Sequence, residues 1–163
     1  MKPSERALLI RAATPAYWAG VLQALRGAKN LVQLGWTQGR PKLRTKTGDC
    51  YCLWGAYDAM LEHVGGKSRL RELKHLGAVV LAEQIALRPI AMSGFPPDWG
   101  DDAAMGPCFD FNDSSETTQE DVVKLLASTI AKVMTYNELA QKRQKERRSS
   151  QLFGQKNRRR RRR

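Results

Sequence analysis

The chain has 163 residues, of which 42% are hydrophobic and 27% are charged, and its formal net charge at pH 7 is +12. A chain of this size and composition is expected to form one domain around one hydrophobic core. The longest nearly apolar run, Leu76 to Ala82, is far shorter than the ~20 residues that span a bilayer, and the N-terminus lacks a secretory pattern, so we expect a cytoplasmic protein with no membrane partner.

Most of the positive charge lies at the C-terminal end. Residues 138–163 hold 12 Lys and Arg against 2 Glu, a net charge of +10, whereas residues 1–137 carry a net charge of +2. Six consecutive arginines close the chain, and their mutual repulsion opposes local folding. The sequence therefore predicts a single mainly helical domain over residues 1–137. Over residues 138–163 it predicts a basic helical extension that ends near Ser149-Ser150, followed by a disordered arginine-rich tail.

The first half of the chain predicts three helices and one irregular stretch. Residues 4–13 form a short helix, and Thr14-Pro15 then opens a helix over about 15–34, because Thr caps helix N-termini and Pro is tolerated at the first helical position. Residues 36–49 contain glycines, Pro41 and threonines, which oppose a helix, so we expect a solvated loop or a short hairpin there. Residues 50–64 are typical of a buried helix, with Asp49 as its N-cap.

Two further helices and a long connection follow. One helix starts at Ser68 and ends before Pro89, since proline disfavours the helical conformation of its predecessor. Residues 90–110 are rich in Gly and Pro and predict a long irregular connection. Thr117 and Glu120 form a capping box that predicts a final helix from about residue 118. The expected fold class is all-α or mainly α, as a compact bundle of four to five helices with a basic C-terminal extension.

Four short motifs occur in order along the chain: Gly35-Trp36-Thr37-Gln38-Gly39, Cys52-Leu53-Trp54-Gly55-Ala56, Phe111-Asn112-Asp113, and Thr118 with Glu120-Asp121-Val122. Over roughly residues 15–135 this pattern resembles a family of small bacterial and phage proteins of unknown function. The resemblance implies no activity, and the basic tail lies outside it. In this chain Phe111 stands where the family pattern has tryptophan.

These motif residues have two interpretations. In the architectural one, Gly55 and Ala56 permit a close helix crossing, Cys52 is a small apolar filler, and Asn112-Asp113 bind backbone donors in the turn before the last helix. In the other, polar side chains converge on a small ligand. The residues of this candidate pocket are Gln38, Cys52, Asn112 and Asp113.

No motif establishes an enzyme or a cofactor. A thiol at a helix N-terminus can become a nucleophile, with His63 or His75 as its base, but a helix that runs from Cys52 to His63 would place them ~16 Å apart. Structural zinc sites use two ligand pairs, and the chain offers only Cys50-x-Cys52. Residues 65–68 lack the first glycine of a phosphate-binding loop. We therefore expect no catalytic residue, no metal and no cofactor.

The leading functional hypothesis is a non-enzymatic accessory protein that binds the backbone of DNA or RNA, largely without sequence specificity. The cations assigned to this interface are Lys142, Arg143, Lys145, Arg147, Arg148, Lys156, Arg158, Arg159, Arg160, Arg161, Arg162 and Arg163. A second set extends the interface if residues 40–46 form a strand, because alternate residues then share one face: Arg40, Lys42, Arg44 and Lys46.

An acidic segment supplies the alternative hypothesis. No Lys or Arg lies between Arg88 and Lys124, whereas eight carboxylates lie between residues 98 and 121. In this alternative the chain is a protein interaction or assembly module, phage-encoded as the resemblance allows, that uses this acidic surface to contact a host or self partner. The basic tail can also dock on that surface, in the same chain or in another copy. A cysteine-dependent enzyme is the third hypothesis.

Overall fold

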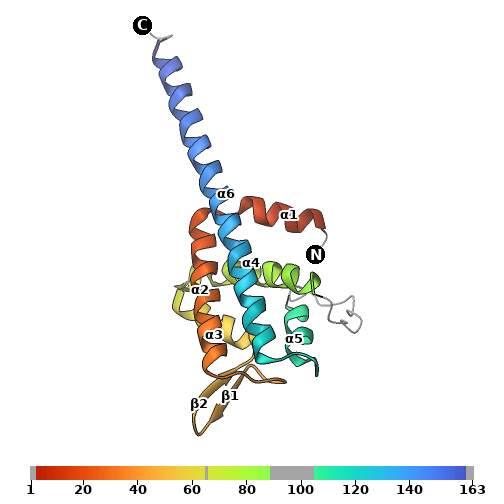
Figure 1. The fold of residues 1–163 in the computed structure, drawn as a ribbon. Coiled ribbons are helices and arrows are strands. Elements are labelled where there is room, and N and C mark those ends of the chain that lie inside the picture. Colours follow the sequence, from red (N-terminus) through yellow and green to blue (C-terminus); the bar gives the residue numbers. More distant parts are fainter. Residues whose placement is uncertain (1–2, 65, 89–104, 161–163) are drawn as a thin grey trace.

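The computed structural model describes residues 3–64, 66–88 and 105–160, in which six helices and one two-stranded sheet are present (Figure 1). The helices are α1 (Pro3–Ala12), α2 (Pro15–Leu34), α3 (Leu53–Val64), α4 (Gly66–Ala86), α5 (Gly106–Asp113) and α6 (Gln119–Arg160), and the strands are β1 (Lys42–Thr45) and β2 (Gly48–Tyr51). The prediction of a mainly α fold is confirmed. The structure has one helix more than the four to five expected, because α5 begins inside the segment predicted to be irregular, residues 90–110.

Helix α2 is the central element of the core, and α3, α4 and α6 pack against it. Apolar residues recur on its inner face at helical spacing. Its buried side chains are Trp18, Val21, Leu22, Ala24, Leu25, Ala28 and Val32. Helix α6 runs antiparallel to α2, since Gln119 Nε2 donates to the carbonyl oxygen of Val32 at 2.6 Å near one end and the rings of Trp18 and Tyr136 lie 5.3 Å apart near the other.

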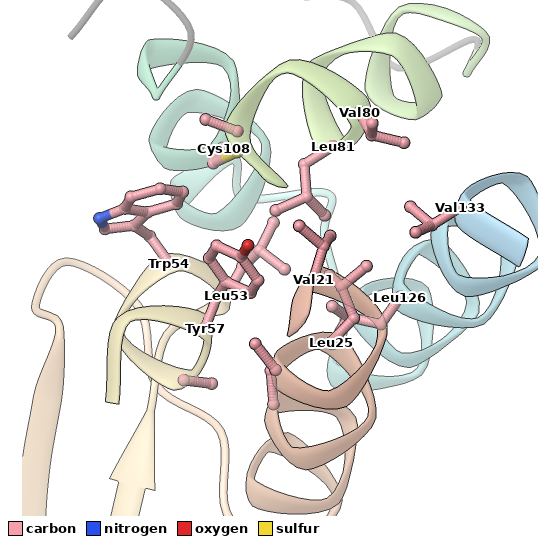
Figure 2. Packing of buried hydrophobic residues seen from close by; sticks show 14 of the residues in the cluster. Val21, Leu25, Leu53, Trp54, Tyr57, Val80, Leu81, Cys108, Leu126 and Val133 are labelled. Atoms are coloured by element: carbon pink, nitrogen blue, oxygen red, sulfur yellow. The ribbon is translucent and has the colours of Figure 1, made fainter. Parts of the chain in front are cut away.

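Apolar side chains of four helices, α3 to α6, meet those of α2 (Figure 2). Leu53 and Tyr57 enter from α3, Leu81 from α4, Cys108 from α5 and Leu126 from α6. The buried hydroxyl of Tyr57 donates to the carbonyl oxygen of Leu73 at 2.8 Å, so this polar group has a hydrogen-bond partner inside the core. A Cβ at Gly77 would overlap the Tyr57 ring, so α3 and α4 approach closely only because this position is glycine.

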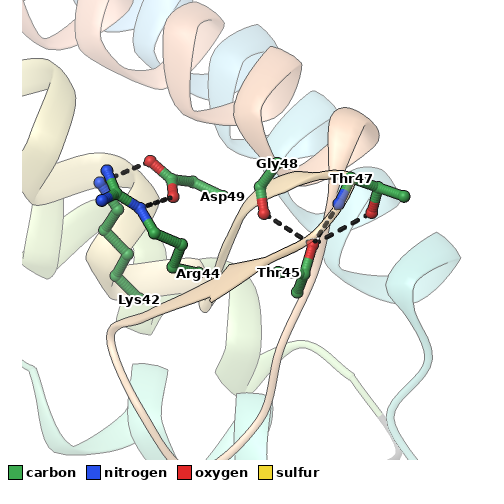
Figure 3. A network of polar contacts seen from close by, with 6 residues as sticks. All are labelled: Lys42, Arg44, Thr45, Thr47, Gly48 and Asp49. Carbon is green, nitrogen blue, oxygen red and sulfur yellow. Dashed lines mark hydrogen bonds and ion pairs between the residues drawn. The ribbon is translucent and has the colours of Figure 1, made fainter.

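The hairpin lies at one end of the body and the C-terminal half of α6 extends from the other (Figure 1). The strands pair antiparallel from Lys42 with Tyr51 to Thr45 with Gly48, and they leave a two-residue turn. Thr45 Oγ1 donates to the carbonyl oxygen of Gly48 at 2.7 Å and accepts the N–H of Thr47 at 3.3 Å (Figure 3). The hairpin predicted within residues 36–49 is therefore present, with its second strand extending to Tyr51.

The predicted start of α6 near residue 118 is confirmed, whereas the predicted cap of α3 is wrong and the predicted cap of α6 is shifted by one residue. Asp49 does not cap α3, because residues 48–51 are extended and pair with β1, and α3 begins only at Leu53. The capping box lies one residue later than predicted. Asp121 Oδ2 accepts the backbone N–H and the hydroxyl of Thr118, and the Thr118 hydroxyl accepts the N–H of Asp121 at 3.3 Å. The side chain of Thr117 points into the body instead and is buried.

Helix α6 continues through Ser149 and Ser150, where the sequence predicted its end. Both serine hydroxyls donate to carbonyl oxygens one turn earlier, those of Lys145 and Glu146, and the helix persists to Arg160. Two features favour this length. Lys, Arg, Gln and Glu are good helix formers, and acidic residues in the first turn with basic residues in the last complement the helix dipole. Residues 161–163 lie outside the described residues.

Candidate functional site

The side chain of Asn112, at the end of α5, lies at the centre of a polar network that joins three segments. It is 1% exposed. Its Oδ1 accepts the indole N–H of Trp36 and the backbone N–H of Leu53, each at 2.9 Å. Its Nδ2 donates to the carbonyl oxygen of Thr37 at 3.2 Å and to Asp113 Oδ1 at 2.8 Å. All four hydrogen-bonding positions of this amide are therefore used within the chain.

The neighbouring polar residues complete the same network. Gln38 Nε2 donates to the carbonyl oxygens of Asn112 and Ser114, at 3.0 and 2.9 Å. Asp113 Oδ1 accepts the backbone N–H of Gly39 at 2.8 Å. Gly39 has φ = +70°, a conformation that favours glycine. Three members of the candidate pocket, Gln38, Asn112 and Asp113, are thus brought together, and they bind one another and the backbone.

Cys52, the fourth member, stands immediately before α3. Its Sγ accepts the N–H of Gly55 at 3.1 Å, while Asn112 takes the N–H of Leu53, so these two residues together satisfy free donors at the helix start. The Cys52 N–H binds the carbonyl oxygen of Pro41 at 3.1 Å. A Cβ on Gly55 would overlap that same oxygen. The close approach at Gly55 is therefore to the backbone of the loop before β1, which corrects the prediction of a helix crossing.

The environment of Cys52 does not activate its thiol. The side chain is buried, and burial raises the pKa of the thiol above its ordinary value despite the N–H donors from Gly55 and Trp54, which act in the opposite direction. Burial also raises the pKa of Cys108. A nucleophilic cysteine needs a lowered pKa and access to substrate. The observed geometry is that of a capping residue within the core.

The hairpin holds two of its four candidate cations in ion pairs. Asp49 lies across the sheet from Arg44, and its carboxylate lies 2.7 Å from Lys42 Nζ and 3.4 Å from Arg44 Nε (Figure 3). The hydrogen bond from Lys42 lowers the pKa of Asp49, and the same bond raises the pKa of Lys42. Arg40 and Lys46 lie outside β1. The four residues therefore form no common strand face, and Figure 1 places the hairpin of β1 and β2 at the opposite end of the molecule from the C-terminal half of α6.

The acidic segment is described only in part, since Asp98, Asp101 and Asp102 lie outside the described residues. Several of its other carboxylates have partners within the chain. Asp113 binds Gly39, Asp121 binds Thr118, and Glu120 lies 2.8 Å from Lys124 Nζ. Because α6 runs away from this end of the body, its described residues up to Arg160 do not dock on these carboxylates in the same chain (Figure 1).

The predicted basic interface lies on the outer half of α6, which we call the projecting helix and define as residues 141–160. At 1.5 Å per residue it is ~30 Å long. Side chains are described as far as residue 151, and within residues 141–151 all are exposed except that of Arg143, which is half-buried. The sequence from 141 to 151 contains no apolar residue. The structure therefore presents Lys142, Lys145, Arg147 and Arg148 to solvent on one rigid element.

The base of the projecting helix is held by α1 and α4. Arg143 lines a surface pocket of about 460 Å³ together with Ala7, Ile10, Arg11, Glu83, Tyr136 and Leu139. Ala140 is buried, and Tyr136 donates from its hydroxyl to Glu83 Oε2 at 2.9 Å. The packing of α6 against the body thus extends beyond residue 137, as far as Arg143.

Trp36 is as central to the polar network as Gln38, but it was not among the residues predicted to form the pocket. A half-buried indole presents an N–H that requires an acceptor, and this need was the available signal. The backbone partners, the N–H of Leu53 and the carbonyl oxygen of Pro41, could not be predicted from the sequence, because main-chain groups are the same in nearly every residue.

The fold and site define a small helical protein with an interlocked polar network at one end and a basic helix projecting from the other. The chain belongs to a family described as "Family of unknown function (DUF6197)", whose model matches residues 17–132. The polar network lies inside the matched region and the projecting helix lies outside it. Membership in a family of unknown function was expected from the motifs, whereas the motif pattern itself and the bacterial or phage origin stay predictions.

Further comparisons give no functional lead. No curated protein and no solved structure matches the chain significantly. Among the described residues, no helix is both long and apolar enough to cross a membrane. Within the same ranges, no three His, Cys, Asp or Glu side chains are grouped so as to hold a metal ion.

Proposed function

We propose that the protein is a non-enzymatic accessory protein that binds the phosphate backbone of nucleic acid through its projecting helix, largely without sequence specificity. One observation carries the proposal: a helix with no apolar residue from 141 to 151 presents its cations to solvent, beyond the contacts that fold the body. Repulsion between these cations is a cost that a polyanion removes on binding.

The charge is large enough for such binding. If six to eight of the 12 cations in residues 138–163 contact phosphates, counterion release gives a slope of about −5 to −7 in log K against log salt concentration. Binding of this kind reads the backbone rather than the bases. Between 141 and 160 the only large apolar residues are Leu152 and Phe153, too few for the apolar face that membrane-surface helices bury in the lipid.

The test is the affinity of the full-length chain for a fluorescent DNA duplex of about 20 base pairs, measured by anisotropy from about 50 to 200 mM salt. In a helix variant, four exposed cations of the projecting helix are replaced by glutamine, which preserves helix propensity: Lys142, Lys145, Arg147 and Arg148. We expect the salt slope to fall by as much as about 3.6 in magnitude, at 0.9 per lost contact.

A body variant provides the matched control. It replaces four cations elsewhere by glutamine and so changes the net charge by the same amount: Arg26, Lys29, Lys124 and Lys132. Its affinity and its slope are expected to stay near those of the unchanged chain. If both variants lose the same affinity, the binding depends on the net charge of the protein and not on the position of the cations. A helix variant that binds as well as the unchanged chain would move the site into the body.

A further inference from the structure

We infer that the projecting helix binds in the major groove of duplex DNA, in preference to duplex RNA. This inference rests on the proposed function and specifies the nucleic acid and the place of the helix on it. Three properties of the projecting helix support it: the distribution of the described cations around the helix axis, the dimensions of the helix, and the fact that the helix is folded before any partner binds.

The cations surround the helix axis instead of forming a stripe. At 3.6 residues per turn, successive residues are rotated by about 100°. The exposed cations Lys142, Lys145, Arg147 and Arg148 therefore point in four directions, and the widest gap between neighbours is about 140°. A helix lying on a flat or convex anionic surface would use only one side. A groove with phosphates along both walls engages cations on several sides at once.

The dimensions of the helix fit the DNA groove. An α-helix with its side chains is about 10–12 Å across. The major groove of B-form DNA is about 12 Å wide and admits an α-helix, whereas the major groove of A-form RNA is deep and narrow. The main chain stays helical through residues 149 and 150 as far as Arg160, so the helix is continuous over the whole of the projecting part.

The free protein presents the helix already folded. Ordering a residue's backbone on binding costs ~1–2 kcal/mol per residue, and a helix anchored in the core through Val133 and Ala140 avoids much of that cost. The first turn of α6 is acidic and its end is basic, which stabilises the helix before any partner is present.

The test compares three duplexes with the same base sequence and the same number of phosphates, using the full-length chain at one salt concentration. The first is unmodified DNA. The second is DNA whose cytosines carry glucosylated hydroxymethyl groups at C5, a position that opens into the major groove. The third is duplex RNA. We expect the affinity for the second and third duplexes to be at least about tenfold lower than for the first. In both, the helix cannot enter the major groove, whereas the number of phosphate charges is unchanged.

Two paired variants test the engagement of several sides. The side chains of Lys142 and Lys145 are centred about 140° around the axis from those of Arg147 and Arg148. In the groove, replacing either pair by glutamine lowers the salt slope by about 1.8 in magnitude. A loss confined to one pair would show that the helix binds through one face and would overturn the groove placement.

The outcomes separate this inference from the proposed function. Equal affinity for all three duplexes overturns the major-groove placement and leaves backbone binding intact. Tighter binding to the RNA duplex overturns the preference for DNA. Absence of binding to every duplex refutes the proposed function itself, and the groove placement falls with it.

Discussion

The side chain of Asn112 accepts a hydrogen bond from the indole N–H of Trp36 at 2.9 Å, although 76 positions separate the two residues. The same oxygen accepts the N–H of Leu53, so one amide connects the loop after α2, the start of α3 and the end of α5. Replacing this amide therefore affects three segments at once.

Asn112→Ala is expected to lower the free energy of unfolding by about 2–4 kcal/mol, because the donors of Trp36 and Leu53 lose their acceptor in a largely buried place. Urea unfolding followed by circular dichroism measures the change. Asn30→Ala, on an exposed position of α2, is the matched control and should change stability by less than about 0.5 kcal/mol. Similar losses at both positions would contradict the role given to the Asn112 network.

Gly55→Ala is expected to cost about 3 kcal/mol or to prevent folding, because the added Cβ meets the backbone carbonyl of Pro41, which has little freedom to move. Gly20→Ala is the control. There the nearest atoms belong to the flexible side chain of Leu73, at 2.9 Å, and the gain in helix propensity of about 1 kcal/mol offsets the crowding. Thermal unfolding compares the two variants, and a Gly55→Ala protein as stable as Gly20→Ala would refute the close contact.

The Asp121 cap gives a pH dependence with a definite sign. Its hydrogen bonds with Thr118 lower the pKa of Asp121, so the folded state favours the carboxylate. The stabilisation is present above the ordinary Asp value of about 4 and is lost as the pH falls through the lower pKa of the folded state.

Asp121→Asn is therefore expected to lower stability by about 0.3–1 kcal/mol at neutral pH, from the lost charge at the helix N-terminus, and the difference from the unchanged protein should vanish near pH 2. Unfolding free energies measured between those pH values provide the check. Glu138→Gln serves as the control, since Glu138 is exposed in the middle of α6, far from the helix N-terminus. A difference that is constant with pH would exclude an ionised cap.

The three cysteines are expected to differ in reactivity toward iodoacetamide at about pH 8. Cys50 is half-buried, whereas Cys52 and Cys108 are buried and burial raises the pKa of both. Mass spectrometry of the native protein should find the label on Cys50, with Cys52 and Cys108 labelled only after denaturation. Rapid labelling of native Cys52 would revive the hypothesis of a cysteine-dependent enzyme.

A proline at position 149 distinguishes the contribution of the helical structure of the projecting helix from the contribution of its charge. Ser149→Pro keeps every cation but removes an N–H and clashes with the carbonyl of Lys145, which breaks the helix there. If the helix binds as a rod, this variant binds a DNA duplex several-fold more weakly than Ser149→Ala, which serves as its control. Equal affinity in the anisotropy assay would show that a flexible charged tail is sufficient.

The sequence predicted those helices whose apolar residues recur with a clear period. Helix α2 lies at its expected position because Pro15 stands at its first position and its inward residues repeat at helical spacing, although the side chain of Thr14, predicted to cap the helix, makes no cap hydrogen bond. Helix α5 was missed because its eight residues, Gly106–Asp113, are too few to show a period and start with Gly and Pro. The helical reading of residues 50–52 failed because backbone pairing with Lys42 and Trp36 overrides local preference.

The side chains of the candidate site could be predicted from the sequence, but their role could not. The polar types and order of Gln38, Asn112 and Asp113 suggested that they converge, and they do. Their partners include main-chain groups of Gly39 and Leu53, whose positions depend on the fold. A side chain that binds a ligand and one that binds a buried N–H require the same polar atoms, and only the structure shows which partner is present.

Helix α6 is continuous from the half that packs in the core to the half that stands free. The direction in which the free half points is therefore set by the elements that α6 packs against, α2 and α4. A force applied to the outer turns would reach the body first at Ala140 and Val133, the buried residues of α6 nearest to the free half, and only then at Leu126 and Leu125.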